Sequence, residues 1–404
     1  MYRDGLTYNS HFINLNDPGD IKRELLSIGV EQESIEELMD RFLYCSLRLE
    51  NIDTRAANLM NSYLNSLGGT LAMHKDAQDY TRSKTDVVVS GNRKVFRDLA
   101  ERLKGEPFDL DKIASDIERS LVARNRTITW GSRTLDFNRK TYIMGILNCT
   151  PDSFYPESRV NGTEAALKGA RRMITSGVDI IDIGGESTRP GSNGVSVSEE
   201  LKRVIPIIKA IRKESNVIIS IDTRKREVAE QALDEGADMV NDVSGLKRNR
   251  QLAELVAERG VPIILMHMQG EPKTMQTNPF YSNTISDILK DLQASISFAL
   301  NAGISEQRII IDPGIGFGKR IKDNLRIIKE LKAFQSLNFP ILIGISRKSF
   351  IGQILNQPVE GRLIGTITAN TLAVVNGADV LRVHDVSDAV EMVKIIESIG
   401  QLSV

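Results

Sequence analysis

The chain has 404 residues, of which 26% are charged, and its formal net charge is −1. This length exceeds what a single hydrophobic core usually supports, so two domains are expected. The near-zero net charge argues against a general binder of nucleic acid or of membrane surfaces. Two cysteines cannot make a disulfide framework. Neither a signal peptide nor a span of roughly 20 apolar residues is recognisable, so we expect a globular, cytoplasmic protein.

The first part of the chain, residues 1–124, mixes helical and strand-like segments. Helical patterns are predicted at 17–29, 54–69 and 92–105, and apolar strands at 42–49, 70–74 and 85–91. We therefore expect a small α+β domain of unknown role, followed by a helical linker at 108–125. His11 and His74 occur here singly, which favours surface or core imidazoles over metal or substrate ligands.

A repeating pattern begins after a short hairpin that is expected at 127–140. Trp130, the single tryptophan, fits a packing plug at the lower end of the next domain better than a ligand contact. From about residue 139 onward, an apolar run, a polar or Gly-rich loop and an amphipathic helix alternate. The apolar runs are 142–148, 178–185, 217–223, 238–245, 261–267, 308–314, 340–346 and 380–386.

Continuously apolar runs of this kind are typical of parallel strands that are buried on both faces. Eight such βα units fit a closed (β/α)8 barrel, which typically takes about 250 residues. The alternative is a doubly wound open sheet, which usually has fewer strands and one crevice at a switch point. We predict an α/β protein with a (β/α)8 TIM barrel over 125–404, preceded by the small α+β domain over 1–124.

Each of the eight runs ends in polar or charged side chains. In a barrel the carboxyl ends of the strands converge on one face, and that face carries the active site. Any one of these residues could merely cap the next helix, as Asp242 and Asp385 do in the simplest interpretation, but all the runs together indicate a site. The residues are Asn148, 186–190, Asp222, Asn241, Asp242, His267, Asp312, 346–348, Arg382, His384 and Asp385.

The residue types in this set exclude several catalytic classes. There is no Ser-His-Asp set, no cysteine nucleophile and no His/Cys metal cage. The oxygens of Asp222, Asn241 and Asp312 suit the donor-rich edge of a heterocycle. The Gly-rich turn 184–192, together with Arg189, suits a phosphate or pyrophosphate. We therefore expect a ligand with a nitrogen-rich ring and a phosphorylated tail.

Residues 140–404 resemble dihydropteroate synthases through motifs that each fall at a separate strand end. They are "LNCTPDSF", "DIGGESTRPGS", "IDTRK", "VNDVSG", "MHMQGEPKTMQ", "DPGIGFGK", "GISRKS" and "LRVHDV". Some members of that family also carry an N-terminal extension similar to the one here. The resemblance implies a transferase of folate biosynthesis and a sulfonamide target. It would join 6-hydroxymethyl-7,8-dihydropterin diphosphate to p-aminobenzoate and release pyrophosphate.

The resemblance also implies a role for individual residues. The pterin ring would be bound by Asp222, Asn241, Met266, Asp312, Phe317, Gly344, Lys348 and Arg382. The diphosphate would be held by Asn148, Thr188, Arg189 and His384, and Mg²⁺ by Asn148 and Asp152. The aminobenzoate pocket would comprise Phe154, Thr188, Pro190, Lys348 and Ser349. The catalytic residues would be Lys348, Asp222, Arg382 and His384.

Two other functions are compatible with most of the same motifs. A pterin-binding methyltransferase of the corrinoid type shares the barrel and the acidic pterin contacts, but it would need neither the Lys-Ser pair at 348–349 nor the "STRP" turn. A non-catalytic pterin-binding protein would lack the diphosphate groups, yet Asn148, Arg189 and His384 are present.

Cys149, expected to be buried, and Ile315 depart from the family pattern. Family members are often dimers, so we expect a homodimer with small-molecule substrates and with neither a nucleic-acid nor a membrane partner.

Overall fold

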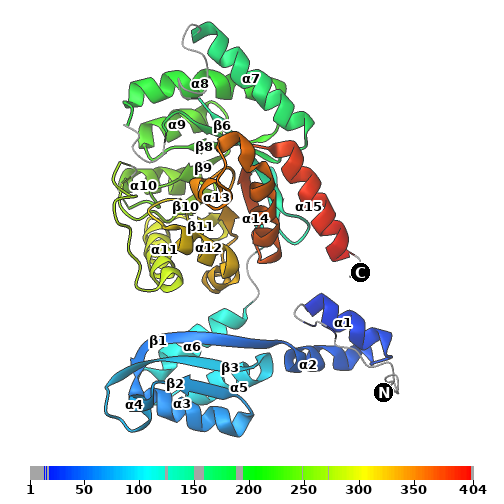
Figure 1. Ribbon diagram of the computed structural model, residues 1–404, viewed down its shortest axis with the longest axis vertical. Helices are drawn as coiled ribbons and strands as arrows, with labels where there is room; N and C mark the ends of the chain where they lie inside the picture. The colour runs from blue at the N-terminus through cyan, green and yellow to red at the C-terminus, as the bar shows by residue number, and fades with distance from the viewer. Residues whose placement is uncertain are drawn as a thin grey trace. The chain divides into compact units, whose positions relative to one another are not determined.

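The computed structural model describes residues 13, 15, 18–122, 126–149, 159–187, 194–247, 249–271 and 273–401. The chain divides into two compact units, one of residues 1–123 with 399–404 and one of residues 124–398 (Figure 1). Among the described residues, no helix is both long enough and apolar enough to cross a membrane.

The first unit is built on a three-stranded antiparallel sheet in the order β1-β3-β2. Its strands are β1 (Tyr44–Asp53), β2 (Thr70–Met73) and β3 (Lys84–Asn92). Its helices are α1 (Pro18–Ser27), α2 (Gln32–Phe42), α3 (Thr54–Leu67), α4 (Lys75–Gln78), α5 (Arg93–Leu103) and α6 (Leu110–Leu121). Burial alternates along β3, so that Val87 and Val89 pack with Leu64 of α3 and Phe96 of α5. The predicted α+β architecture is confirmed.

Helix α6 differs from the helical linker that the sequence suggested. Its residues Leu110, Ile113 and Ile117 lie on one face and are buried in the same core as α3 and α5. The helix is therefore a structural part of the first unit. His74 is exposed, and its Nδ1 accepts the N–H of Asp76 at 3.2 Å as the N-cap of α4, whereas His11 lies outside the described residues.

The second unit is a closed barrel of parallel strands. The strands are β6 (Tyr142–Asn148), β7 (Ile180–Gly184), β8 (Ile218–Asp222), β9 (Met239–Asp242), β10 (Ile263–Met266), β11 (Ile309–Asp312), β12 (Leu342–Ile343) and β13 (Val380–Val383). Their order is β11-β10-β9-β8-β7-β6-β13-β12. A parallel bridge between Ile311 and Ile341 joins β11 to the residue before β12 and closes the ring. The predicted (β/α)8 barrel is confirmed.

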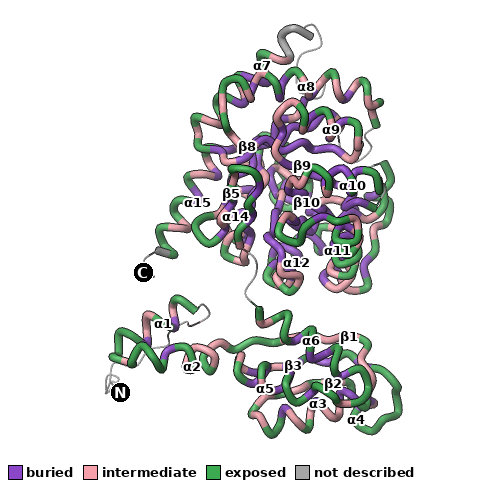
Figure 2. Tube along the Cα trace, turned by 180° about the vertical axis from the view of Figure 1, so that it is seen from behind, coloured by how far each residue is buried: buried purple, intermediate pink, exposed green. Residues whose placement is uncertain are grey.

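Helices surround the strands and bury their outer faces (Figure 2). They are α7 (Arg159–Thr175), α8 (Val197–Glu214), α9 (Arg226–Asp234), α10 (Arg250–Arg259), α11 (Thr284–Asn301), α12 (Ile321–Lys329), α13 (Ser349–Leu355), α14 (Leu363–Val375) and α15 (Val386–Gln401). Short 3₁₀ helices are η2 (Glu306–Arg308), η3 (Leu331–Leu337) and η4 (Val359–Arg362). Cys149 and Ile315, which depart from the family pattern, are both buried in this core.

A hairpin closes the amino-terminal end of the barrel, as predicted. Strands β4 (Thr127–Trp130) and β5 (Arg133–Asp136) pair antiparallel. Ile128, Trp130 and Leu135 belong to one buried cluster with inward-facing residues of the barrel strands. Trp130 is 6% exposed, which confirms it as a packing plug. Because this end is filled, a substrate can enter only from the carboxyl ends of the strands.

Candidate active site

The interior of the barrel changes from apolar to polar along the strands. Every second residue of a strand points inward. At the level of the hairpin, the inward residues are apolar: Met144, Ile180, Met239, Ile264, Ile310, Leu342 and Val380. Nearer the carboxyl ends, the strand register places Asp182 beside Ser220, Asp222 beside Asn241 and Met266 beside Asp312. Polar groups from strands far apart in the sequence therefore meet inside the mouth of the barrel.

Arg382 of β13 joins two carboxylates inside the barrel. Its Nε donates to Oδ2 of Asp182 at 2.7 Å, and its Nη2 donates to Oδ2 of Asp222 at 2.8 Å. The amide Nδ2 of Asn241 donates to the same Asp182 oxygen at 3.1 Å. Asp182 is fully buried and was missed by the sequence analysis. The available signal was a carboxylate at an inward position of an otherwise apolar strand.

Burial shifts the pKa values of the ionisable side chains in this group. It raises the pKa of Asp222, against the opposing effect of the nearby Arg382. Burial also raises the pKa of Asp312 to about 6, although Oδ1 of Asp312 accepts the N–H of Gly314 at 2.7 Å. It lowers the pKa of Lys348 to about 8, an effect that the neighbouring Arg382 reinforces. Carboxylates and an amine held this far from their ordinary pKa values are typical of a functional site rather than of a solvated surface.

An apolar wall lies beside these polar groups. Met266, Val243, Met268 and Met275 form a buried cluster, and Phe317 packs against it. The ammonium of Lys348 lies 4.2 Å from the centroid of the Phe317 ring. Gly314, at a φ of 71°, allows the turn toward Phe317, because a Cβ there would lie 1.9 Å from the carbonyl oxygen of His267. The predicted pocket residues Met266, Phe317 and Lys348 are therefore brought together.

The ends of β12 and β13 form a second polar group. Nδ1 of His384 lies 3.0 Å from Oγ of Ser346, and burial lowers the pKa of His384 to about 4, so the ring is neutral near neutral pH. Arg347 donates two hydrogen bonds to the Asp385 carboxylate, at 2.9 and 2.7 Å. Asp385 thus ties the two loops together instead of only capping a helix.

Three further assigned residues lie near these groups. Gly344 packs against Arg382, because a Cβ added at Gly344 would lie 3.7 Å from Cβ of Arg382. Ser349 begins α13. Asn148 ends β6, in register with Gly184 of β7. The other assigned residues, Asp152, Phe154, Thr188, Arg189 and Pro190, lie outside the described residues.

Two strand-end residues have a different place from the one expected. His267 is 2% exposed and points away from the barrel interior, where its Nδ1 meets Lys319 at 2.8 Å and its Nε2 meets Asp291 of α11 at 3.2 Å. It therefore anchors β10 to α11 and does not face the mouth. Asp242 accepts the N–H groups of Ser244 and Leu246 at 2.8 and 2.7 Å. It therefore stabilises its own turn and does not cap the next helix α10, whose N-cap is Asn249.

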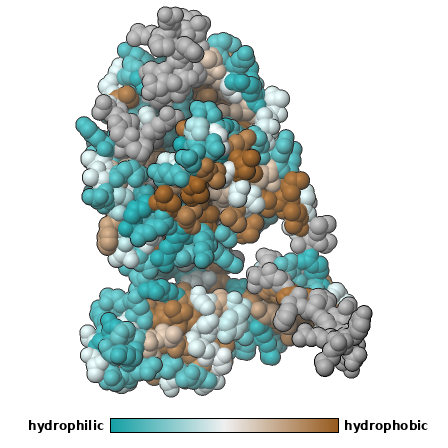
Figure 3. Space-filling model, viewed as in Figure 1, coloured by the Kyte–Doolittle hydropathy of each residue, from teal (hydrophilic) through white to brown (hydrophobic). Residues whose placement is uncertain are grey.

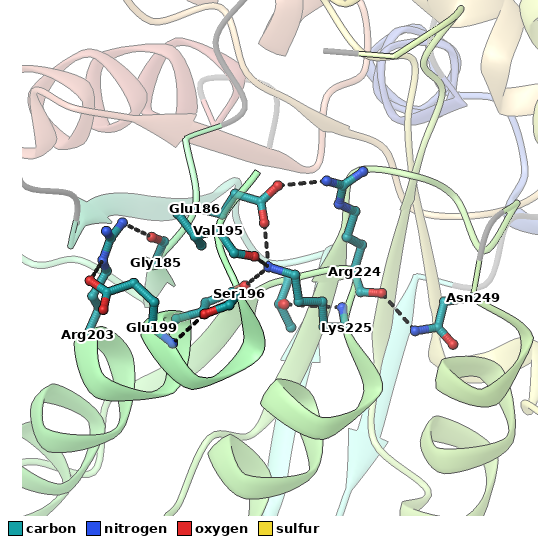
Figure 4. Close-up of polar contacts among 11 residues, drawn as sticks. Gly185, Glu186, Val195, Ser196, Glu199, Arg203, Arg224, Lys225 and Asn249 are labelled. Atoms are coloured by element: carbon teal, nitrogen blue, oxygen red, sulfur yellow. Dashed lines mark hydrogen bonds and ion pairs between the residues drawn. The ribbon is translucent and has the colours of Figure 1, made fainter. Parts of the chain in front are cut away.

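An ionic network supports the loop that follows β7 (Figure 4). Glu186 accepts from Arg224 at 2.7 Å and also from the ammonium of Lys225. That ammonium bonds the buried Glu200 of α8 and, at 2.8 Å, the carbonyl oxygen of Val195. Residues 186 and 195 are thereby fixed to the loop after β8. Sequence reasoning placed Glu186 at a strand end but missed this network.

Comparison with known proteins identifies the class. Residues 144–384 match the family model described as pterin binding enzyme. A dihydropteroate synthase of Synechocystis is 44% identical over 270 residues, which cover 67% of this chain and 93% of that protein. A crystal structure of the Yersinia pestis dihydropteroate synthase with a sulfonamide drug complex superposes with a TM-score of 0.65 at 40% identity, and the match covers 68% of this chain and 99% of that one.

A third relative extends beyond the barrel. A probable bifunctional folylpolyglutamate synthase/dihydropteroate synthase of Halobacterium salinarum is 38% identical over 347 residues, which are 86% of this chain and 42% of that protein. A match of this length must include part of the first unit. Taken with the polar barrel mouth, the comparisons define a pterin-binding (β/α)8 enzyme. The chain belongs to the dihydropteroate synthase family, whose members are transferases.

Proposed function

We propose that this protein joins 6-hydroxymethyl-7,8-dihydropterin diphosphate to p-aminobenzoate and releases pyrophosphate in folate biosynthesis. The observation that carries this proposal is the set of buried acceptors Asp222, Asn241 and Asp312, which lies with the half-buried Lys348 at the barrel mouth. A dihydropterin carries N–H donors at its 2-amino group, N3 and N8, and acceptors at its 4-oxo oxygen and N5. Oxygen acceptors and one ammonium complement that pattern.

The reaction breaks the bond between the pterin methylene carbon and a diphosphate oxygen, and it forms a bond from that carbon to the aniline nitrogen, which loses a proton. Because the electron-rich ring stabilises positive charge on the methylene carbon, no protein nucleophile is needed. Diphosphate departs with negative charge, so hydrogen-bond donors and cations at its position lower the barrier. We assign that task to Asn148, Thr188, Arg189 and the neutral His384, whose Nδ1 is occupied by Ser346.

The aminobenzoate is assigned to Lys348 and Ser349, with walls from Phe154, Thr188 and Pro190. Lys348 precedes α13 and Ser349 is its first residue, so both can face the carboxylate of the second substrate. An open hollow runs from Ser349 along α13 and is lined by Gln353, Asn356 and Arg362. A sulfonamide, which resembles aminobenzoate in shape, would compete for the same place.

Mg²⁺ is part of the proposal, with Asn148 and Asp152 as its protein ligands. Among the described residues there is no group of three or more His, Cys, Asp or Glu side chains that could hold a metal. An amide oxygen at the end of β6 nevertheless fits this ion, since Mg²⁺ is commonly bound by one or two protein oxygens, several waters and substrate phosphates. When bound, the ion would neutralise part of the charge on the departing diphosphate.

The purified chain is expected to form dihydropteroate from the two substrates only when Mg²⁺ is present. Chelation with EDTA should abolish the product, and added Mg²⁺, but not Zn²⁺, should restore it, because diphosphate and amide oxygens are hard ligands. Product formation followed by chromatography, with a heat-denatured sample as control, makes the measurement. Full activity in chelated buffer would refute the requirement for Mg²⁺. No product with either ion, together with no aminobenzoate binding, would leave a methyltransferase or a non-catalytic pterin binder.

Pterin affinity is expected to fall as the pH drops through about 6, because burial raises the pKa of Asp312 to about 6. The raised pKa means that the carboxylate, an acceptor, becomes a protonated carboxyl at a pH where ordinary aspartates stay ionised. Fluorescence titration with a pterin at a series of pH values gives the profile. Asp312→Asn should bind more weakly at alkaline pH and show no step near that pKa. A step of unchanged size in this variant would contradict the assignment.

We also propose that the protein is a homodimer through the face formed by α13, η4 and α14. Exposed apolar residues occur there, including Ile354, Val359, Ile364, Leu372 and Val375. Figure 3 shows a brown, hydrophobic patch in the region of α13 and α14. Ile364 alone is 80% exposed. A contiguous apolar patch on a protein surface commonly marks an interface.

Light scattering is expected to give a dimer for the native chain. The double variant Ile364→Glu/Leu372→Glu should give a monomer, because charges would be buried at the interface. Ile28→Glu, at an apolar site of the first unit whose exposure lies between those of Ile364 and Leu372, serves as the control and should leave the dimer intact. A native monomer at micromolar concentration would exclude this interface.

Two broader assignments complete the proposal. We place the domain boundary between residues 124 and 125, so that the whole site lies in the barrel domain. A cytoplasmic location fits Cys45 and Cys149, neither of which is in a disulfide.

A further inference from the structure

Asp182 lies beneath the groups that are assigned to the pterin ring. It is on β7, is fully buried, and faces the barrel interior beside Ser220 of β8. Its Oδ2 receives hydrogen bonds from Nε of Arg382 and from Nδ2 of Asn241. Its Oδ1 is enclosed and has no hydrogen-bond partner among the described residues. The side chain is too deep to meet a ring that contacts Asp222 and Asn241 from above, so its role must be exerted through its neighbours.

The contact with Asn241 fixes the orientation of that amide. An oxygen that already accepts from an arginine can only accept again, so the NH₂ group of Asn241 must face Asp182. The reverse orientation would set two oxygens against each other in a buried place. Oδ1 of Asn241 therefore points away from Asp182. It has no partner among the described residues and, unlike Oδ1 of Asp182, is not enclosed.

Asn241 then differs from Asp222 in the kind of hydrogen bond it can offer. Burial raises the pKa of Asp222, so this side chain can become protonated and can donate as well as accept. Asn241 has no such freedom while Asp182 holds its NH₂ group. Its exposed oxygen stays an acceptor at every pH at which the protein is folded.

We propose that Asp182 is a positioning residue that locks Asn241 as an acceptor, and that this acceptor selects a reduced pterin, which carries N–H at position 8. A fully aromatic pterin has a lone pair at N8 instead of a hydrogen. That lone pair would face the Asn241 oxygen without a shared proton, and a buried pair of acceptors is unfavourable. The inference rests on the proposed function, since it presumes that the ligand is a pterin and that N8 of its ring lies against the Asn241 oxygen.

The test compares 6-hydroxymethyl-7,8-dihydropterin with 6-hydroxymethylpterin, which differ only in the hydrogens at positions 7 and 8. Binding of each to the full-length protein is measured anaerobically by calorimetry. The native protein is expected to prefer the reduced ring by about 10- to 100-fold in Kd. Asp182→Asn, which has the same shape but can donate to Asn241 and allow it to turn over, should bring the two Kd values to within a few-fold of each other.

Two further variants sharpen the result. Asp182→Ala removes both acceptor oxygens and should also erase the preference for the reduced ring. This variant tests the inference even if Asp182→Asn keeps the original hydrogen bonds. Ser220→Ala is the matched control, because it removes a buried polar atom at the paired position without touching Asn241 or Arg382, and it should keep the native ratio. Thermal melting shows that each variant is folded. An unchanged ratio in both Asp182 variants, or no preference in the native protein, overturns the inference. A native protein that binds neither pterin instead overturns the proposed function.

Discussion

Replacement of Lys348 by methionine is expected to lower kcat/KM for dihydropteroate formation by about 10²- to 10³-fold. Burial lowers the pKa of this lysine to about 8. The fold therefore keeps an ammonium group at a place where its charge is unfavourable. The ammonium lies over Phe317 and feels the charges of Asp312 and Asp222. Under the proposed assignment it is the cation that serves the oxo group and N5 of the pterin, and it lies next to Ser349, the residue proposed for the aminobenzoate. Methionine preserves its length and its apolar packing but removes every hydrogen-bond donor.

The pH dependence separates this effect from a simple packing defect. A lysine pKa lowered to about 8 means that the native enzyme should lose activity as the pH rises through that value and the ammonium is deprotonated. Lys348→Met should lack this alkaline limb, while Lys322→Met, at an exposed position of α12, should keep both the limb and the rate. Steady-state rates with each substrate varied make the measurement. A Lys348→Met enzyme with near-native kcat/KM would remove the residue from the mechanism.

The barrel itself was predictable because its signal is local. Each apolar run is followed at once by a turn and an amphipathic helix, and only the closed barrel uses eight such units with all carboxyl ends at one face. The hairpin and its tryptophan were equally accessible, since Ile128 and Trp130 alternate with polar residues along one short strand. Helix α6 was harder, because a helix at a domain junction has the same pattern whether it links the units or packs into one of them.

The site residues show which features the sequence alone could not predict. Met266 and His267 are neighbours in the chain, yet one faces the pocket and the other faces α11, because successive side chains of a strand point to opposite sides. Counting that alternation would have moved His267 out of the site and brought Asp182 in. The partner of Asp182 could not be found this way. Arg382 is 200 residues further along the chain, and only the closure of the barrel sets β13 beside β6, whose other neighbour β7 carries Asp182.

Substitution of Arg382 by methionine should therefore cost stability as well as activity. The sequence assigned Arg382 to the face of the pterin, which predicts an effect on catalysis alone. In the fold, its guanidinium bonds Asp182 and Asp222, which are 0% and 8% exposed. Removing it leaves two buried carboxylates without their cation. Breaking a buried ion pair on one side typically costs about 3–5 kcal/mol, and we expect a loss of that order in the free energy of unfolding of the barrel.

Trp130 makes this loss measurable in the intact chain, because the only tryptophan lies in the plug of the barrel and its fluorescence reports that unit. Urea denaturation should show the Arg382→Met barrel unfolding at a lower urea concentration than the native one. The loss in free energy of unfolding should shrink as the pH falls, because Asp222, whose pKa is already raised, then gains a proton. Arg326→Met, which breaks an exposed pair with Glu330 at 3.0 Å, should change stability by less than about 1 kcal/mol. In the double variant Asp182→Asn/Arg382→Met the loss should be smaller than the sum of the single losses, because the neutral amide no longer needs the cation. Strict additivity would mean that Arg382 does not stabilise the barrel through Asp182. An Arg382→Met barrel as stable as the native one would mean that Arg382 serves the ligand and not the fold.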